Sequence, residues 1–512
     1  MAARRDAMSV IRVRRRLVSL MALVAIWLTG TAHVGSTLVV QDGTAGPYGL
    51  RVLVRPPAVI PGLVDVVIRS TTPNTVPTSV TLQPAIWRYG IKGAPAPERA
   101  VSVPGEPGTF QTQVWIMSSG SYALHIAASG PAGQGEFIVP YTSVASATLG
   151  MPNWLGWVLA ALGAFLVFGL ASLIGSASRE GTLPVGVAPD SARLRRARFA
   201  TGIAGLIAMT LAVGGWTWWK AVERDYRSAL FRPIPSEAHV TAGPQRTLTL
   251  RITDSTWRVV KPGERMRVGR GSNMTPLMPD HGKLMHMFLV AAGGTGAVAH
   301  LHPVRTDERT FVTPLAAVPA GTYWLYADVV HESGAARTMV DTVEVPAGDA
   351  TPSDADDAVA LSPANVTAGP ATMSDGVHFA ITVEGTPTVG RDIVFHAHLT
   401  NADGSTATLL PWLGMAGHAM LLRTDGAVFM HLHPSGTASM AAQDRLARRE
   451  AGDTAMHGDS QPMDMSAMHM SPVPGDVRFP VAFPSAGAYR VFVQVLTADH
   501  QYRTAVIDVT MP

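Results

Sequence analysis

The sequence predicts a mainly β protein with three immunoglobulin-like β-sandwich modules, two transmembrane helices and an N-terminal signal segment. Three observations predict this fold class. Two long apolar runs interrupt the chain. Elsewhere apolar and polar residues alternate in short stretches separated by Gly, Pro, Asp and Asn, a pattern typical of antiparallel strands. Arginines gather beside the apolar runs, as they do where a chain is oriented in a membrane.

The composition excludes several classes of function. The chain has 512 residues, of which 47% are hydrophobic and 15% charged, and it has no cysteine. Disulfide frameworks, Cys-ligated zinc, thiol catalysis and blue-copper centres all need cysteine and are therefore excluded. The net charge of +3 comes with arginines placed at apolar runs, so we expect membrane contact and no nucleic-acid binding. No phosphate-binding loop, dinucleotide fingerprint or nucleophile elbow is found, and we expect no enzyme activity.

The N-terminus has the pattern of a secretory signal. Residues 1–16 are basic, residues 17–27 form a short apolar core, and small residues follow at 30–32. This pattern predicts a signal peptide over residues 1–32. An uncleaved anchor is the alternative, because the sequence does not show cleavage.

Two transmembrane helices are predicted within residues 151–219. The runs 154–174 and 199–219 are each long enough to cross about 30 Å of hydrocarbon. The loop 176–198 is rich in arginine and is expected in the cytoplasm. The large regions on either side then lie outside a bacterial cytoplasmic membrane. Neither run contains an ionisable residue, so we interpret the pair as an anchor in the lipid and not as an ion pathway.

Three extracytoplasmic modules follow from this topology, at residues 33–150, 220–346 and 364–512. Residues 347–363 are rich in Asp, Ala, Ser and Pro and are predicted to form a linker. The second and third modules share a Pro/Ser-Ala-Gly-x-Tyr type of segment and are interpreted as divergent copies. The third module is predicted to contain seven strands, at Gly376–Val383, Asp392–Leu399, Gly417–Thr424, Ala427–His433, Val477–Phe483, Ala488–Leu496 and Tyr502–Thr510.

Histidines recur at matched positions on predicted hairpins of the second and third modules. Asp425-Gly426 predicts a tight hairpin in the third module. Its register places two facing pairs on one face of the sheet, Met420 with His431 and His418 with His433. A hairpin in the second module pairs Phe288 with His300 and His286 with His302 in the same way. Facing side chains lie about 5 Å apart, so each hairpin is predicted to offer a metal site, with the later histidines His331 and His500 as candidates to complete the coordination.

A His-x-His pair on a strand is also common on an exposed polar face, and that alternative stays open for a single copy. The recurrence of His-Leu-His-Pro at 300–303 and 431–434 favours metal ligation. The pair His396 and His398 has the same spacing, and both interpretations remain open for it. His125 and His378 are interpreted as ordinary strand residues.

An insertion rich in methionine and histidine is predicted at residues 435–475. No helical or strand period organises it, and its Asp, Ser, Gly and Ala background is too polar for burial, so a disordered loop is the alternative. Thioethers select Cu(I), and imidazole suits copper in either oxidation state. Copper, as Cu(I) or Cu(II), is therefore expected before zinc, with ligands Met463, Met465, Met468, His469 and Met470.

With these residues identified, the chain resembles the YtkA-like and FixH-like extracytoplasmic modules of bacterial copper-handling membrane proteins. The resemblance rests on the segments 412–420 and 429–434, covers residues 370–512 well and covers 240–346 more loosely. It implies metal ligation by His418, His431 and His433 and, less directly, by His286, His300 and His302. The second module departs from the pattern at 278–281. The insertion resembles the Met-rich segments of periplasmic copper-resistance proteins.

The sequence therefore predicts a non-enzymatic, membrane-anchored protein that binds copper outside the cytoplasm for tolerance, sequestration or delivery. Its expected partners are membrane lipid and copper ions, and a further extracytoplasmic or membrane protein is left open. A scaffold or assembly factor of a membrane complex, with incidental histidines, is one alternative. A copper-dependent redox enzyme is the second, although no catalytic base, nucleophile or cofactor motif supports it.

Overall fold

The computed structural model describes residues 38–243, 245–255, 257, 276–294, 296–315, 318–348, 354–453 and 471–512. The predicted signal segment and the methionines and histidines of residues 454–470 lie outside this description. The chain divides into two compact units, one made of Val144–Phe231 and the other of the residues before and after it. The latter unit is mainly β, as predicted, and contains the predicted modules except residues 144–150 and 220–231, which belong to the helical unit because its second helix extends to Ser228.

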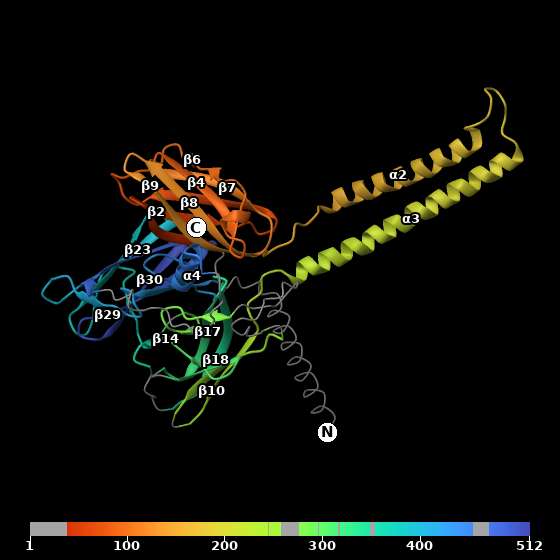
Figure 1. Cartoon of the computed structure of the whole chain (residues 1–512). Coiled ribbons are helices and arrows are strands. Elements are labelled where there is room, and N and C mark those ends of the chain that lie inside the picture. The colour runs from red at the N-terminus through yellow and green to blue at the C-terminus, as the bar shows by residue number, and fades with distance from the viewer. Residues whose placement is uncertain are drawn as a thin grey trace, which may run out of the picture. The chain divides into compact units, whose positions relative to one another are not determined.

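The unit Val144–Phe231 is a pair of antiparallel helices, α2 (Asn153–Glu180) and α3 (Ser191–Ser228) (Figure 1). Both are long and apolar enough to cross a membrane, in agreement with the two predicted spans. Small residues allow the helices to approach closely: a Cβ added at Gly175 would lie 2.1 Å from Thr201 Oγ1. The Asp190 side chain caps α3 by accepting a hydrogen bond from the Arg193 N–H.

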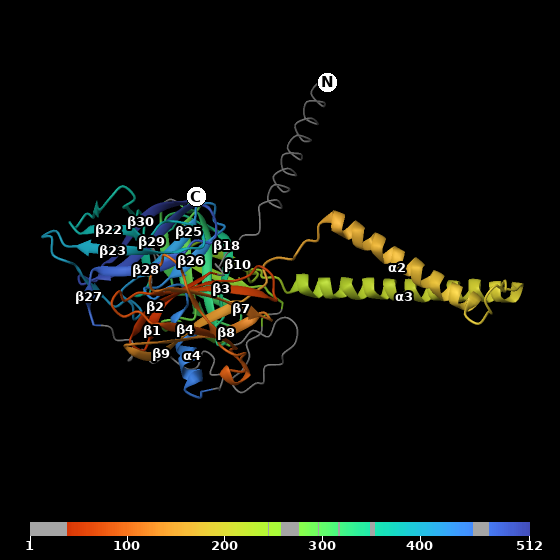
Figure 2. The same cartoon turned by 90° about the horizontal axis from the view of Figure 1, so that it is seen from above.

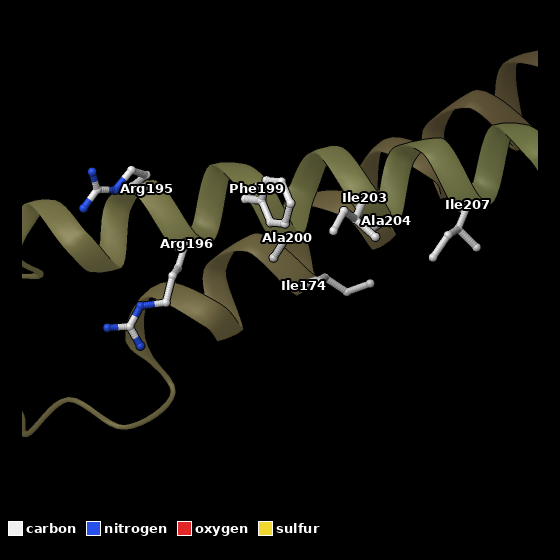
Figure 3. A pocket seen from close by; sticks show the side chains of 8 residues that line it. All are labelled: Ile174, Arg195, Arg196, Phe199, Ala200, Ile203, Ala204 and Ile207. Atoms are coloured by element: carbon white, nitrogen blue, oxygen red, sulfur yellow. The ribbon is translucent and has the colours of Figure 1, made fainter.

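A groove runs between these two helices near the loop that joins them. Figure 3 shows Arg195 and Arg196 at one end of it, with apolar side chains of α3 following along the helix and Ile174 contributed by α2. Beyond the arginines its lining is apolar, as expected of helices that face lipid.

The first module of the β-rich unit, residues 38–143, consists of two antiparallel sheets. One sheet has the order β1 (Val39–Ala45), β2 (Tyr48–Arg55), β3 (Gly62–Ser70), β7 (Thr109–Ile116) and β6 (Val101–Ser102). The other has the order β5 (Glu98–Arg99), β4 (Ser79–Ile86), β8 (Gly120–Gly130) and β9 (Gly133–Ser143), and a short 3₁₀ helix, η1 (Ile91–Gly93), follows β4.

The second module, residues 236–360, has a core between two sheets. One sheet has the order β10 (Ser236–Thr241), β11 (Thr247–Ile252), β16 (Thr310–Pro314) and β15 (Val304–Arg305). The other contains β12 (Leu277–Met278), β17 (Gly321–His331), β13 (His286–Ala291), β14 (Val298–Leu301) and β19 (Ala358–Ala360), with β18 (Ala336–Val345) on β17. The segment 347–363, predicted to be a linker, thus contributes a strand to this sheet.

The third module, residues 364–512, encloses its core in the same way. One sheet has the order β21 (Ala371–Thr372), β22 (His378–Glu384), β23 (Asp392–Thr400) and β28 (Asp476–Ala482). The other contains β20 (Ala364–Asn365), β30 (Tyr502–Met511), β29 (Gly487–Thr497), β24 (Thr408–Leu410), β27 (Val473–Pro474), β25 (His418–Arg423) and β26 (Phe429–Leu432). The seven strands predicted here all coincide with observed strands. The predicted insertion, however, begins with a helix, α4 (Met440–Glu450), whose N-terminus is capped by Ser439.

The second and third modules repeat one pairing scheme. In the second, β18 pairs with β17, β17 with β13 and β13 with β14. In the third, β30 pairs with β29, β29 with β25 and β25 with β26. A tyrosine near the start of the long strand also recurs in all three modules. Tyr122, Tyr323 and Tyr489 each donate a hydrogen bond to a backbone oxygen four residues earlier. The structure therefore supports the interpretation of the second and third modules as copies.

The two copies pack against each other through the outer faces of these equivalent sheets (Figure 2 shows β25, β26 and β29 of the third copy). The ring of Phe429 stacks on Tyr326 with centroids 4.3 Å apart and an interplanar angle of 3°. Phe288 contacts the same phenylalanine at 5.2 Å. A buried apolar cluster, which includes Met420 and Phe492, completes this interface.

Truncating Phe429 tests how much the interface stabilises the chain. Phe429 is 1% exposed, so Phe429→Ala should leave a cavity and lower the free energy of unfolding by about 3–5 kcal/mol. Urea unfolding of the detergent-solubilised chain, followed by circular dichroism, measures this loss. Trp115→Ala is the control, because Trp115 is 60% exposed and its loss should change stability by less than about 0.5 kcal/mol. Equal losses in the free energy of unfolding for the two variants would contradict the expected contribution of the interface to stability.

Candidate metal centre

The hairpin registers predicted from the sequence are those of the structure. Phe288 pairs with His300 on β13 and β14, and Met420 pairs with His431 on β25 and β26. Residues of one strand that differ by two share a face. The histidines of both hairpins therefore lie on the sheet faces that form the interface between the copies, which brings two separately predicted sites together at one end of that interface.

Seven histidines gather there and are called the histidine cluster. Six of them are between 0% and 3% exposed, and the side chain of His431 is 6% exposed. The neighbouring ring centroids lie 4.4–6.5 Å apart. The members are His281, His286, His300 and His302 from the second module and His418, His431 and His433 from the third.

Three pairs of ring nitrogens in the cluster have the separation that a shared metal ion requires. His286 Nδ1 lies 3.1 Å from His300 Nε2. His418 Nδ1 lies 3.3 Å from His431 Nε2, and the Nε2 atoms of His281 and His433 lie 3.4 Å apart. Two nitrogens that bind one tetrahedral ion at about 2.0–2.1 Å are about 3.4 Å from each other. Each pair therefore fits two ligands of one ion.

Backbone carbonyls fix the tautomer of the equivalent residues His286 and His418. His286 Nε2 lies 3.0 Å from the Asp280 carbonyl oxygen, and His418 Nε2 lies 3.3 Å from that of Trp412. A carbonyl oxygen only accepts, so both Nε2 atoms carry the proton and donate it. The lone pair is then on Nδ1, which faces the next ring of the cluster. This arrangement is the usual second shell of a metal-binding histidine.

The candidate ligand atoms form three triads in which all atoms lie within 4.8 Å of one another. One triad joins both copies and consists of His286, His300 and His431. The second, His418, His431 and His433, belongs to the third module. The third contains a carboxylate and again joins both copies, through Asp280, His281 and His433.

Burial keeps the rings of the cluster in the form that binds metal. It lowers the pKa of His286 to about 3 and places those of His300, His418 and His431 well below their ordinary value, and neighbouring imidazoles lower them further. Metal ions bind the neutral ring. At neutral pH, then, no proton has to leave these side chains before an ion binds.

A buried carboxylate orients His302 beside the first triad. Asp357 Oδ1 lies 3.0 Å from His302 Nδ1 and also accepts the backbone N–H of His302. Burial raises the pKa of Asp357 to about 7 and lowers that of His302 to about 3. Nε2 of His302 is buried and has no hydrogen-bond partner among the described residues, and its ring is 4.7 Å from that of His300. His302 is therefore a candidate fourth ligand of the first triad.

His281 and Asp280 are functional candidates that the sequence analysis missed. They belong to a turn that both copies share, since Asp280 bridges to Lys283 just as Trp412 bridges to Met415. His281 and Leu413 occupy the same position of this turn, with φ of 53° and 50°. Aligning the two copies backward from His286 and His418 would have revealed the turn, although the differing side chains conceal it.

Several predicted ligands lie elsewhere. His331 is on the opposite face of β17, in the core of the second module, where its ring is 5.7 Å from Trp257. His500 is exposed in the turn between β29 and β30. The prediction that these residues complete the coordination does not agree with either position. Met420 does reach the interface, opposite His431. Met463, Met465, Met468, His469 and Met470 lie outside the described residues.

The partly exposed pair on β23 has carboxylate partners of its own. His396 lies between Glu384 and Asp476, and His398 lies 3.6 Å from the same aspartate. These ion pairs agree with the solvated-face alternative that the sequence left open.

The first module has no equivalent of the cluster. Ala127, Asp328 and Gln494 lie at the same distance after the recurring tyrosine of their modules. In the first module this residue pairs with Thr81, in the second with His286 and in the third with His418. A threonine thus stands where both copies carry a histidine.

Comparison with known proteins adds one family match. A family model described as a domain of unknown function, DUF8832, matches residues 236–347 and 371–512. These ranges contain all seven residues of the histidine cluster. No curated protein sequence matches the chain.

Solved structures resemble the chain only weakly. A tetra-tandem repeat from the extending region of a large adhesion protein is 7% identical over 92% of this chain and 82% of its own, with a TM-score of 0.14. A putative membrane anchored protein from Corynebacterium diphtheriae is 10% identical over 93% and 96%, with a TM-score of 0.13. Alpha-2-macroglobulin from E. coli is 9% identical over 95% and 24%, with a TM-score of 0.19. These scores are too low to support an inference about fold or function.

The buried rings predict a steep loss of stability in acid for the metal-free chain. Below about pH 6.5 the histidines of the unfolded chain take up protons that the folded cluster does not bind. The free energy of unfolding therefore decreases as the pH is lowered, by at most about 1.4 kcal/mol per pH unit per histidine. Asp328 and Asp357, whose pKa values burial raises to about 7, act in the opposite direction but are fewer. Urea unfolding between pH 7 and pH 5 in a chelator measures the slope.

A single substitution provides the check on this slope. His300→Asn should reduce the pH dependence by about one proton, whereas the exposed His500→Asn should leave it unchanged. A stability that does not vary between pH 7 and pH 5 would show that the cluster is protonated in the folded chain.

Proposed function

We propose that this chain is a membrane-anchored protein that binds copper outside the cytoplasm, in tolerance, sequestration or delivery, and that the histidine cluster is its binding site. One observation supports the proposal above the others. Three pairs of buried imidazole nitrogens, 3.1–3.4 Å apart, lie at the interface of two repeated modules. A purely structural core would be expected to use apolar side chains there, because burial of so many imidazoles is costly.

The choice of copper rests on the type of donor. Imidazole suits copper, zinc and nickel, and among divalent ions copper binds most strongly to such sites. Met420, buried opposite His431, adds a thioether next to the imidazoles. The methionine-rich sequence from 456 to 470 supplies further soft ligands that favour Cu(I). Zinc is the second choice of metal.

The proposed location follows from the helical unit. Two helices meet the length and composition for crossing a membrane, and the arginines between them favour a cytoplasmic loop. The modules on either side would then lie outside the cytoplasm. We also propose that the modules are immunoglobulin-like, since each has two sheets and a tyrosine turn similar to that of immunoglobulin domains.

Copper content of the purified chain tests the proposal. Every triad contains His431 or His433, so His431→Asn combined with His433→Asn removes a ligand from all three. Full-length protein from copper-supplemented cells should carry at least one equivalent of copper, and the double variant should carry at least one equivalent less, any remainder being held by the methionine-rich segment. Mass spectrometry of the metal content measures both.

The matched control is His396→Asn with His398→Asn. This pair has the same His-x-His spacing on a strand, but it is partly exposed and paired with carboxylates. Its copper content should equal that of the unmodified chain. Equal copper in all three proteins would exclude the cluster as the binding site, and circular dichroism would show that each variant is folded.

The carboxylate behind His302 offers a milder test. Asp357→Asn keeps the size of the side chain but removes the negative charge that orients His302 Nδ1. Loss of such a partner weakens metal affinity about 10- to 100-fold. Competition with a chromophoric chelator measures the affinity. Asp354→Asn is the control, because Asp354 forms its ion pair with Lys283 and is exposed.

A further inference from the structure

We propose that the histidine cluster is a two-ion centre, in which one ion binds His286, His300 and His431 and a second binds Asp280, His281 and His433. The inference rests on the proposed metal-binding function and extends it to a number of ions and to a second, carboxylate-containing position. Seven rings and one carboxylate are more than one ion needs, since a transition metal in a protein commonly takes four ligands.

The two triads of this proposal are called the outer triads. They can be occupied together because they have no residue in common. The nitrogens of His286 and His300 are 3.1 Å apart, and those of His281 and His433 are 3.4 Å apart. Each triad therefore has its own closely spaced pair and its own third ligand.

The central triad competes with both outer ones. It consists of His418, His431 and His433, so it needs a ring from each of its neighbours. One ring nitrogen binds one ion, and the central position is thus filled only when an outer one gives up a ligand. Two ions in the outer triads use six of the candidate ligands without any conflict.

The carboxylate position is built into the fold. Asp280 is 4% exposed, and its Oδ1 accepts the N–H of Ala441 at 2.8 Å, close to the N-terminus of α4. The positive end of a helix stabilises an adjacent negative charge. Oδ1 also lies 3.7 Å from His281 Nε2. A buried carboxylate beside two imidazoles supplies a charge that would offset part of the charge of a second cation.

The two ions would be close neighbours. His431 and His433 belong to different outer triads but lie two residues apart on the chain, with ring centroids separated by 4.4 Å. Two Cu(II) ions held by adjacent rings interact magnetically. An electron paramagnetic resonance spectrum of the copper-loaded chain should therefore show coupled spins and not two independent signals.

Cobalt(II) titration of the full chain in detergent counts the ions. Cobalt is used because thioethers are poor ligands for it, and every protein carries His457→Asn and His469→Asn so that the insertion offers no imidazole. The unmodified cluster should bind two equivalents.

His300→Asn and His281→Asn should each bind one equivalent, and His418→Gln alone should bind two. The combination of His300→Asn with His281→Asn should bind at most one, because the central triad then has His431 and His433 free. Adding His418→Gln to that combination should leave none.

Asp280→Asn distinguishes a lost ligand from a lost fold. Asparagine retains an oxygen that accepts the Ala441 N–H, so the contact with α4 can persist while the negative charge is removed. This variant should bind one equivalent tightly and the second at least about tenfold more weakly, with an unchanged circular dichroism spectrum.

Other stoichiometries would overturn the inference. One equivalent in the unmodified cluster, or loss of both after His281→Asn alone, would mean a single shared ion. Loss of an ion after His418→Gln would assign the central triad as a binding position. In those cases metal binding would persist and the proposed function would stand, whereas no cobalt and no copper in any protein would reject both.

Discussion

Packing between the two repeated modules is the interaction on which the candidate site depends. Each copy presents the outer face of one sheet, and Phe288 and Tyr326 of the second copy meet Phe429 of the third in a buried apolar cluster. Because side chains alternate along a strand, the same register that aims these aromatic residues at the interface also aims the histidines there. Without this contact each copy would expose a few imidazoles on a solvated sheet.

The local features were predictable from the sequence, and their assembly was not. Alternation fixed the strands of the third module, and the Asp425-Gly426 turn gave the pairing of Met420 with His431. Two separate sites were expected, because nothing local in a sequence states that two outer sheet faces pack on each other. The turn that carries His281 escaped notice for a related reason: its equivalence to the turn at Leu413 lies in a shared backbone conformation, whereas the side chains differ.

Segments that looked like connections also proved to be structural parts. Residue 357 was assigned to a linker by composition, yet Asp357 is 5% exposed and orients His302. The insertion begins with α4, on which Leu446 packs against Trp87 of the first module and Arg445 pairs with Glu332 of the second. These partners are far apart in the chain, so short-range composition and periodicity could not reveal them. In both segments, polar residues that looked like those of a connection make contacts with the modules around them.

The chemistry of the cluster follows from how its neutral rings are buried. An imidazole in a protein interior needs a partner for its N–H and for its lone pair. Carbonyls and Asp357 satisfy the N–H groups of His286, His418 and His302. The lone pairs of His286 Nδ1 and His418 Nδ1 therefore face the Nε2 atoms of neighbouring rings in the cluster. The nitrogen that faces each of them can supply either a proton or a second lone pair, and in the second case the two nitrogens can hold a shared cation. The second shell thus selects tautomers of His286 and His418 that leave their inner nitrogens able to bind a cation, as the proposed metal-binding function requires.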